Sequence, residues 1–451
     1  MRVARLNFSH GTHETHAAYL AAVRQAAEDL CCSVSVLADL QGPRLRVGQL
    51  PQPVELKQGS EVVLSESAQD GDAIPIDLPR LAEQLSPGSR VLLDNGKIEL
   101  QVLATDPPRV RCRVTEGGVL ESHKGVNLPD VLLDLPAVTP RDRGDLEFAV
   151  SKDVDYVAMS FVRTAEDVRQ LRALLKQLGR EDVPVIAKLE KPHAVTHLDE
   201  ILREVDGVMV ARGDLGVELP LERVPLVQKQ IIAQANRAGV PVITATEMLE
   251  SMIEEGRPTR AEASDVANAV LDGTDAVMLS GETATGKHPV EAVQVMANIV
   301  REVEESLAGR EVWEPGKLES PFDYANAVGH CACHAAMDLK AEAIVAFTRS
   351  GLTARLISKY HPPLPIIALS PDPRTCRRLP LLWGVRPVLT ENIFDSDQML
   401  RHVDDVLLRS GIVKRGDLVI ITAGLPSVSR QPTNMMKVHR VGESESWGTP
   451  P

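Results

Sequence analysis

Short runs rich in valine and isoleucine recur along this chain, and a longer segment with helical spacing of apolar residues follows each one. Regular alternation of strand and helix is typical of a (β/α)8 barrel, in which eight parallel strands close into a cylinder. Only seven such runs precede residue 300, so the pattern predicts an α/β barrel that is one strand short of a closed cylinder. The runs are Val3–Asn7, Val34–Asp39, Asp155–Phe161, Pro184–Glu190, Asp206–Asp214, Val240–Thr246 and Asp275–Ser280.

Two other patterns interrupt this alternation and predict further domains. Between residues 49 and 135 the strands are short and punctuated by proline and glycine, which indicates an inserted small β-barrel domain. After a linker at 313–320, strands and helices alternate again over 321–445, which favours an open α/β domain. The barrel is then expected at 1–48 and 136–312, with a polar tail at 446–451.

Composition limits the functions that the chain can have. A net charge of −14 over 451 residues, with both signs mixed, argues against a nucleic-acid partner. No apolar run approaches the length of a membrane span, and the six cysteines show no spacing of a secreted disulfide framework. We therefore expect a cytoplasmic protein without a membrane or nucleic-acid partner.

The polar residues that end the barrel strands are the candidate site, because the carboxyl ends of barrel strands meet at one mouth. Lys188 and Glu190 are two apart on a strand and point to the same face. With Asp214 they offer the oxygen ligands that Mg²⁺ prefers, beside a fixed cation that would stabilise phosphoryl transfer or an enolate. The full set is Arg5, Asn7, Ser9, His10, Asp39, Ser160, Lys188, Glu190, Asp214, Thr246, Ser280 and Glu282.

The stretch 212–216 reads RGDLG, and its glycines would let backbone amides approach an anion. The alternative is that these glycines only make a tight turn. A single lysine or glutamate at a strand end is likewise more often a structural ion pair than a catalytic group. Convergence of the whole set favours the catalytic interpretation.

Long stretches of the chain resemble the pyruvate kinase family, in the family's own order. They occupy residues 3–11, 39–48, 91–100, 123–129, 135–142, 185–191, 208–220, 243–252, 257–293 and 348–355. The resemblance implies phosphate transfer from phosphoenolpyruvate to ADP, giving pyruvate and ATP, beneath a mobile lid formed by the inserted domain. It also implies a cytoplasmic glycolytic enzyme that is a homotetramer.

The resemblance assigns roles to individual residues. Glu190 and Asp214 would bind Mg²⁺ or Mn²⁺, and Lys188 would stabilise the transferring phosphoryl group. Gly213 and Asp214, with Thr246, would hold the substrate carboxylate. Four residues would serve the nucleotide and its phosphates, with Arg5 also acting in catalysis; they are Arg5, Asn7, His10 and Lys124.

The chain departs from the family pattern at the monovalent-cation site, which would use Asn7, Ser9 and Asp39. Leu40 replaces the usual threonine, and Arg44 stands where the family has a glutamate. Because a guanidinium is permanently charged, Arg44 would supply the charge that K⁺ provides elsewhere. The hypothesis is a K⁺-independent enzyme; the alternative is a surface arginine without a role.

In the last domain, Thr348, Ser350 and Thr353 match a loop that binds phosphorylated effectors in the family. The later loop at 424–434 lacks the glycines usual there, which disfavours fructose bisphosphate as the effector.

The start of the chain also differs from the family pattern, since family members have a strand ahead of the segment that begins at Val3. The resemblance therefore implies that the missing barrel strand is the first. The chain would then be a truncated product or a sequence with a late start. Three interpretations remain open: an active pyruvate kinase, which the complete site set favours, another Mg²⁺-enolate barrel enzyme such as an aldolase, and a non-catalytic homologue.

Overall fold

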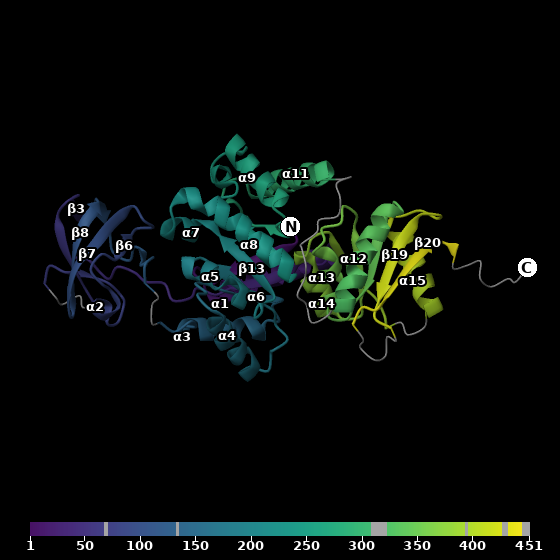
Figure 1. Ribbon diagram of the computed structural model, residues 1–451, viewed down its shortest axis with the longest axis horizontal. Helices are drawn as coiled ribbons and strands as arrows, with labels where there is room; N and C mark the ends of the chain where they lie inside the picture. The colour runs from purple at the N-terminus through teal and green to yellow at the C-terminus, as the bar shows by residue number, and fades with distance from the viewer. Residues whose placement is uncertain (67–70, 132–134, 308–322, 393–395, 426–431, 444–451) are drawn as a thin grey trace, which may run out of the picture.

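The computed structural model describes residues 1–66, 71–131, 135–307, 323–392, 396–425 and 432–443. Figure 1 shows three parts in a row, with a β-rich part at one end, a strand-and-helix body in the middle and an α/β part at the other end. The predicted linker at 313–320 and tail at 446–451 lie outside the described residues. The predicted domain boundaries stay a prediction.

The central body is a curled sheet of seven parallel strands that follow one another in chain order. Each strand is one of the seven predicted runs, and most strand residues are buried on both faces, as in a sheet covered by helices. Within the described residues, the outer edges of the first and last strands pair with no other strand. The strands are β1 (Val3–Asn7), β2 (Ser35–Asp39), β11 (Tyr156–Met159), β12 (Val185–Leu189), β13 (Gly207–Ala211), β14 (Val242–Ala245) and β15 (Ala276–Val277).

Helices cover this sheet, and several begin at a threonine that fixes the turn after a strand. Thr12, Thr139 and Thr259 each accept a hydrogen bond from the backbone of the first helical turn, in a capping box. Such caps fix the residue at which each helix begins. The helices are α1 (His13–Asp29), α3 (Pro140–Ser151), α4 (Ala165–Gln177), α5 (Pro192–Thr196), α6 (Leu198–Leu202), α7 (Arg212–Glu218), α8 (Val224–Ala238), α9 (Arg260–Leu271), α10 (Gly281–Ala284) and α11 (Pro289–Leu307).

The inserted domain consists mainly of antiparallel strand pairs, with one short parallel pair, around its own apolar core. In β8 the arginines at 109, 111 and 113 are exposed while the residues between them are buried, as the alternation in the sequence predicts. Its strands are β3 (Val54–Leu56), β4 (Glu61–Ser65), β5 (Ile74–Pro75), β6 (Arg90–Leu93), β7 (Ile98–Asp106), β8 (Arg109–Glu116), β9 (Gly118–Leu120) and β10 (Val126–Asn127), with one short helix, α2 (Leu81–Gln84).

The last domain is an open sheet of order β18-β17-β16-β19-β20. Strands and helices alternate in this domain as the sequence predicts, but the sequence missed the antiparallel edge strand β20, whose residues are mostly exposed and carry weak strand signal. The strands are β16 (Ala343–Phe347), β17 (Ile366–Ser370), β18 (Val385–Leu389), β19 (Leu418–Ala423) and β20 (Met435–Arg440). The helices are α12 (Asp323–Asp338), α13 (Leu352–Ser358), α14 (Pro373–Arg378) and α15 (Ser396–Ser410).

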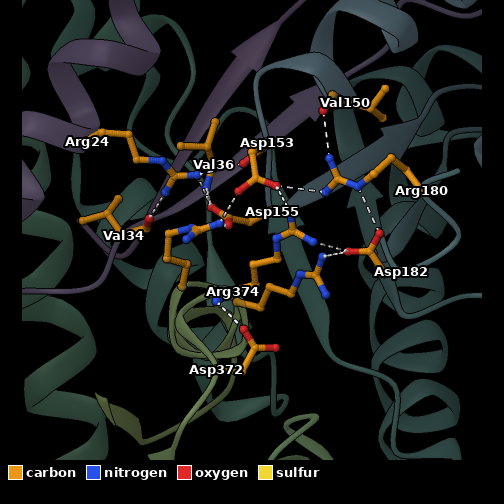
Figure 2. Close-up of polar contacts among 12 residues, drawn as sticks. Arg24, Val34, Val36, Val150, Asp153, Asp155, Arg180, Asp182, Asp372 and Arg374 are labelled. Carbon is orange, nitrogen blue, oxygen red and sulfur yellow. Dashed lines mark hydrogen bonds and ion pairs between the residues drawn. The ribbon is translucent and has the colours of Figure 1, made fainter. Parts of the chain in front are cut away.

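This domain docks on the amino-terminal ends of the barrel strands through α14. Arg377 contacts Asp153 at 2.7 Å and Asp155 at 2.8 Å, and Arg378 contacts Asp182 at 2.9 Å. Figure 2 shows these carboxylates among arginines from both domains. The inserted domain lies at the opposite mouth of the barrel, where the carboxyl ends of the strands meet. Over the part of the chain that the structure describes, no helix is both long and apolar enough to cross a membrane.

Candidate active site

Lys188 is the centre of a polar cluster at the mouth of the barrel. Its side chain projects from the end of β12 and is 9% exposed. The Nζ atom donates to Ser160 Oγ at 2.8 Å and lies 2.8 Å from Glu190 Oε1 and 3.3 Å from Asp39 Oδ1. Three consecutive strands of the sheet, β2, β11 and β12, thus bring their polar ends to one ammonium group.

The charges of this cluster determine its protonation. Burial alone would lower the pKa of Lys188, but the attraction of Asp39 and Glu190 outweighs it and raises that pKa. Burial would raise the pKa of Asp39, yet Lys188 and Arg5 together lower it, and Arg5 Nε donates to Asp39 Oδ2 at 2.6 Å. Lys188 and Asp39 are therefore charged at neutral pH.

Glu190 behaves differently from Asp39. Its carboxylate is 1% exposed, and Oε2 accepts a hydrogen bond from the Phe161 amide at 2.7 Å. Burial raises the pKa of Glu190; Lys188 opposes this, while the negative charge of Asp214 adds to the rise. Two carboxylates that repel each other, one buried and one half-buried, are the oxygen set that a divalent cation would join, so the residues fit such a metal.

The loop after β14 lies against the start of α7. Gly213 N donates to Thr246 Oγ1 at 2.8 Å, and that hydroxyl donates to the carbonyl of Ala245 at 2.7 Å. The predicted carboxylate-binding residues Gly213, Asp214 and Thr246 are therefore adjacent. The Gly213 amide is already used within this structure, so a bound carboxylate would compete with the Thr246 hydroxyl for it.

Asn7 ends β1 at the same mouth, and Ser9 and His10 follow it. Asn7 Oδ1 accepts a hydrogen bond from the Ser9 amide at 3.1 Å, and His10 is exposed. Asp39 completes the predicted monovalent-cation set. Its Oδ1 atom is buried and lies 3.3 Å from Lys188 Nζ, so a monovalent cation bound there would share this oxygen with the ammonium group. Leu40 is buried in the apolar core and adds no oxygen ligand from its side chain.

Lys124 belongs to the inserted domain and is held there by two carboxylates. Its Nζ atom lies 3.3 Å from Asp94 and 3.1 Å from Glu121, and hydrogen bonds to Glu121 and Asp94 raise the pKa of Lys124. Among the described contacts, Lys124 has none with the Lys188 cluster, so a role toward a nucleotide requires the lid to move.

A cleft between the lid and the barrel contains basic residues that the sequence analysis did not single out. Arg163, Lys191 and His193 line it together with Arg44 and Asp214. Lys191 directly follows Glu190 in the sequence, a position at the strand end that could have identified it. Arg44 is exposed and lies near Gly125 of the lid.

Ser280 and Glu282 belong to the same mouth, but Glu282 is used structurally. Its buried carboxylate accepts hydrogen bonds from the amides of Ser280 at 2.7 Å and Leu249 at 3.1 Å. It therefore joins the loops after β14 and β15.

The predicted effector residues lie in the last domain, far along the chain from the barrel mouth. Thr348 Oγ1 accepts a hydrogen bond from Gly351 N at 2.9 Å, and Ser350 is exposed. Thr353 is buried, and its hydroxyl lies 2.8 Å from that of Thr433. Residues 426–431 of the later loop lie outside the described residues.

Comparison with known proteins identifies the family of this chain. The family model described as the pyruvate kinase barrel domain matches residues 1–293, and the model described as the pyruvate kinase alpha/beta domain matches residues 326–439. The chain belongs to the pyruvate kinase family. It is therefore a phosphotransferase with the fold that the sequence predicted.

Relatives in the pyruvate kinase family match nearly the whole chain. A pyruvate kinase of Geobacillus stearothermophilus is 46% identical over 98% of this chain and 76% of its own length, and one of Clostridium acetobutylicum is 41% identical over 98% and 94%. The crystal structure of a pyruvate kinase from Cryptosporidium parvum, 36% identical, superposes with a TM-score of 0.93 over 98% of this chain and 91% of that one.

Proposed function

We propose that this pyruvate kinase transfers the phosphoryl group of phosphoenolpyruvate to ADP at the mouth occupied by Lys188, giving pyruvate and ATP. The observation that carries the proposal is the set of contacts around Lys188, in which a buried ammonium group that is charged at neutral pH lies beside a pair of carboxylates able to bind a metal. Such a cation stabilises negative charge on a phosphoryl group in transfer and on an enolate oxygen.

Each residue has a separate part in this proposal. Glu190 and Asp214 would hold Mg²⁺ or Mn²⁺, which when bound supplies charge neutralisation for the phosphoryl oxygens. Thr246 and the amides of Gly213 and Asp214 hold the substrate carboxylate. Arg5 is fixed by Asp39 and presents its guanidinium to the phosphate, and Lys124 of the lid closes over the nucleotide together with Asn7 and His10. Closure excludes water and favours ADP over hydrolysis.

A coupled assay tests the proposal. Purified protein is mixed with phosphoenolpyruvate, ADP and Mg²⁺, and the formation of both pyruvate and ATP is followed. Equal amounts of the two products are expected. Pyruvate without ATP would indicate another enolate-forming activity, and no turnover would favour a non-catalytic homologue.

We also propose that the enzyme does not require K⁺. Leu40 contributes an apolar side chain where a hydroxyl would serve a cation, and Arg44 adds a permanent positive charge on the segment that follows Asp39. Activity in a K⁺-free, tetramethylammonium-buffered assay should equal that in K⁺. Strong activation on adding K⁺ would refute this proposal without affecting the main one.

The last domain carries the remaining proposals. Thr348, Ser350 and Thr353 would bind a phosphorylated effector, and four copies of the chain would form a homotetramer. A shift in the KM for phosphoenolpyruvate with added sugar phosphates tests the first, and light scattering tests the second.

A further inference from the structure

The loop that carries Thr246 has a costly backbone conformation. Thr246 has a φ of 69° and Glu247 a φ of 54°, so two successive residues other than glycine lie in the left-handed region. This region is unfavourable for side chains with a Cβ atom, and especially for a β-branched threonine. Residues persist there only when the surrounding structure holds them.

Arg212 supplies that support from the neighbouring strand end. Its guanidinium donates to the carbonyl of Thr246 at 2.6 Å and more weakly, at 3.3 Å each, to the carbonyls of Ala245 and Glu247. Three successive carbonyls therefore converge on one planar group. Such a fork of donors is specific to arginine, because a lysine ammonium cannot present several coplanar N–H groups.

The guanidinium is itself fixed from a third element. Asp265 on α9 accepts from Arg212 Nη1 at 2.6 Å, and the Arg212 side chain is only 10% exposed. Arg212 also immediately precedes Gly213, whose amide donates to the Thr246 hydroxyl. One residue thus joins the two loops that would form the substrate carboxylate site.

We infer that Arg212 is a positioning residue, which holds Thr246 in its left-handed conformation and aligns it with the start of α7. The identity of the ligand, phosphoenolpyruvate, rests on the proposed function. Arg212 acts through Thr246, so its loss should weaken substrate binding more than turnover.

The variant Arg212→Met tests this inference. The KM for phosphoenolpyruvate is expected to rise between about tenfold and hundredfold, with a smaller fall in kcat, because the released loop would leave its strained conformation. Adding Glu247→Asn should recover part of the KM, since asparagine tolerates the left-handed region better than glutamate. Glu247→Asn alone should have a KM near that of the unaltered enzyme.

Arg180→Met is the matched control. Arg180 also donates to a carbonyl, that of Val150, and to two carboxylates, but it lies among the carboxylates that the last domain contacts, as Figure 2 shows. This variant should lower the melting temperature and leave the KM unchanged. Equal KM increases in both variants would reduce Arg212 to a general stabilising role and overturn the inference.

The variant Asp265→Asn covers the case in which Arg212→Met does not fold. It leaves the guanidinium in place but weakens its anchor, so a KM increase of a few-fold in the same direction is expected. An unchanged KM in every folded variant of Arg212 or Asp265 overturns the inference. An unaltered enzyme that fails to turn over phosphoenolpyruvate and ADP instead contradicts the proposed function, which separates the two failures.

Discussion

The two faces of the barrel both carry carboxylates and basic groups, but these groups have a different role at each face. At the amino-terminal face Asp155 is 1% exposed and accepts hydrogen bonds from the Val36 amide at 2.7 Å and from Arg24 and Arg377 at 2.8 Å each. At the carboxyl-terminal face Glu190 is equally buried, but it is repelled by Asp214.

We infer from this difference that the carboxylates of the first face contribute to stability and those of the second face to ligand binding. A buried carboxylate whose donors are all provided by the protein contributes to domain docking, because no ligand can improve its environment. A buried carboxylate that faces a like charge is improved by a cation, so the folded protein stores an unfavourable interaction that a metal would relieve. Left-handed residues other than glycine occur at both faces, Asp153 at the first and Phe161 and Thr246 at the second.

The largest effect is expected from removing the central cation of the catalytic face. Lys188→Met should lower kcat by at least about a thousandfold, because no other group replaces the ammonium beside the transferring charge. The coupled assay measures kcat, and a thermal melt establishes that the variant folds. A folded variant within tenfold of the unaltered enzyme would contradict the assignment of Lys188.

The opposite face should respond in stability rather than in catalysis. Asp155→Asn leaves two arginines without their shared carboxylate, so the free energy of unfolding should fall by about 3 kcal/mol while the KM stays unchanged. Asp182→Asn is the control, since Asp182 is 41% exposed and its ion pairs should contribute less than about 1 kcal/mol. Denaturant unfolding compares the two variants, and equal losses would remove the distinction between buried and exposed pairs.

The sequence predicted the catalytic face better than the docking face, for a physical reason. Lys188 and Glu190 end a strand whose period is visible locally, and barrel topology then requires their convergence with Asp214. The partners Asp155 and Arg377 are 222 positions apart and belong to different domains. The left-handed conformation of Thr246 could not be predicted from the sequence either. It depends on the guanidinium of Arg212, and no local sequence pattern indicates that contact.

The affinity for a divalent metal should fall on acidification. This fall should begin at a higher pH than it would if the carboxylate had an ordinary pKa. The pKa of Glu190 is raised, so this group becomes protonated, and loses its capacity to bind a cation, at a pH above the usual range for glutamate. Below that raised pKa, the apparent Kd for Mn²⁺ should increase by about tenfold per pH unit. Titrations followed by electron paramagnetic resonance measure it, and Glu190→Gln should bind weakly at every pH. A Kd independent of pH down to the ordinary range would contradict the role of Glu190.

The smallest effect is expected at the connection between the catalytic face and the lid. Asn127 in β10 donates to Glu218 Oε1 at 2.9 Å, and Glu218 ends α7, the helix that begins beside the proposed substrate site. One neutral donor to a buried carboxylate contributes about 1–2 kcal/mol, so Asn127→Ala should raise the KM for ADP only a few-fold. A lid that closes less completely also admits water, so the ratio of pyruvate to ATP should rise above one.

Gln58→Ala is the control, because this exposed amide bonds to Thr115 within the lid. If both variants keep the product ratio at one, the contact between Asn127 and Glu218 does not govern closure of the lid.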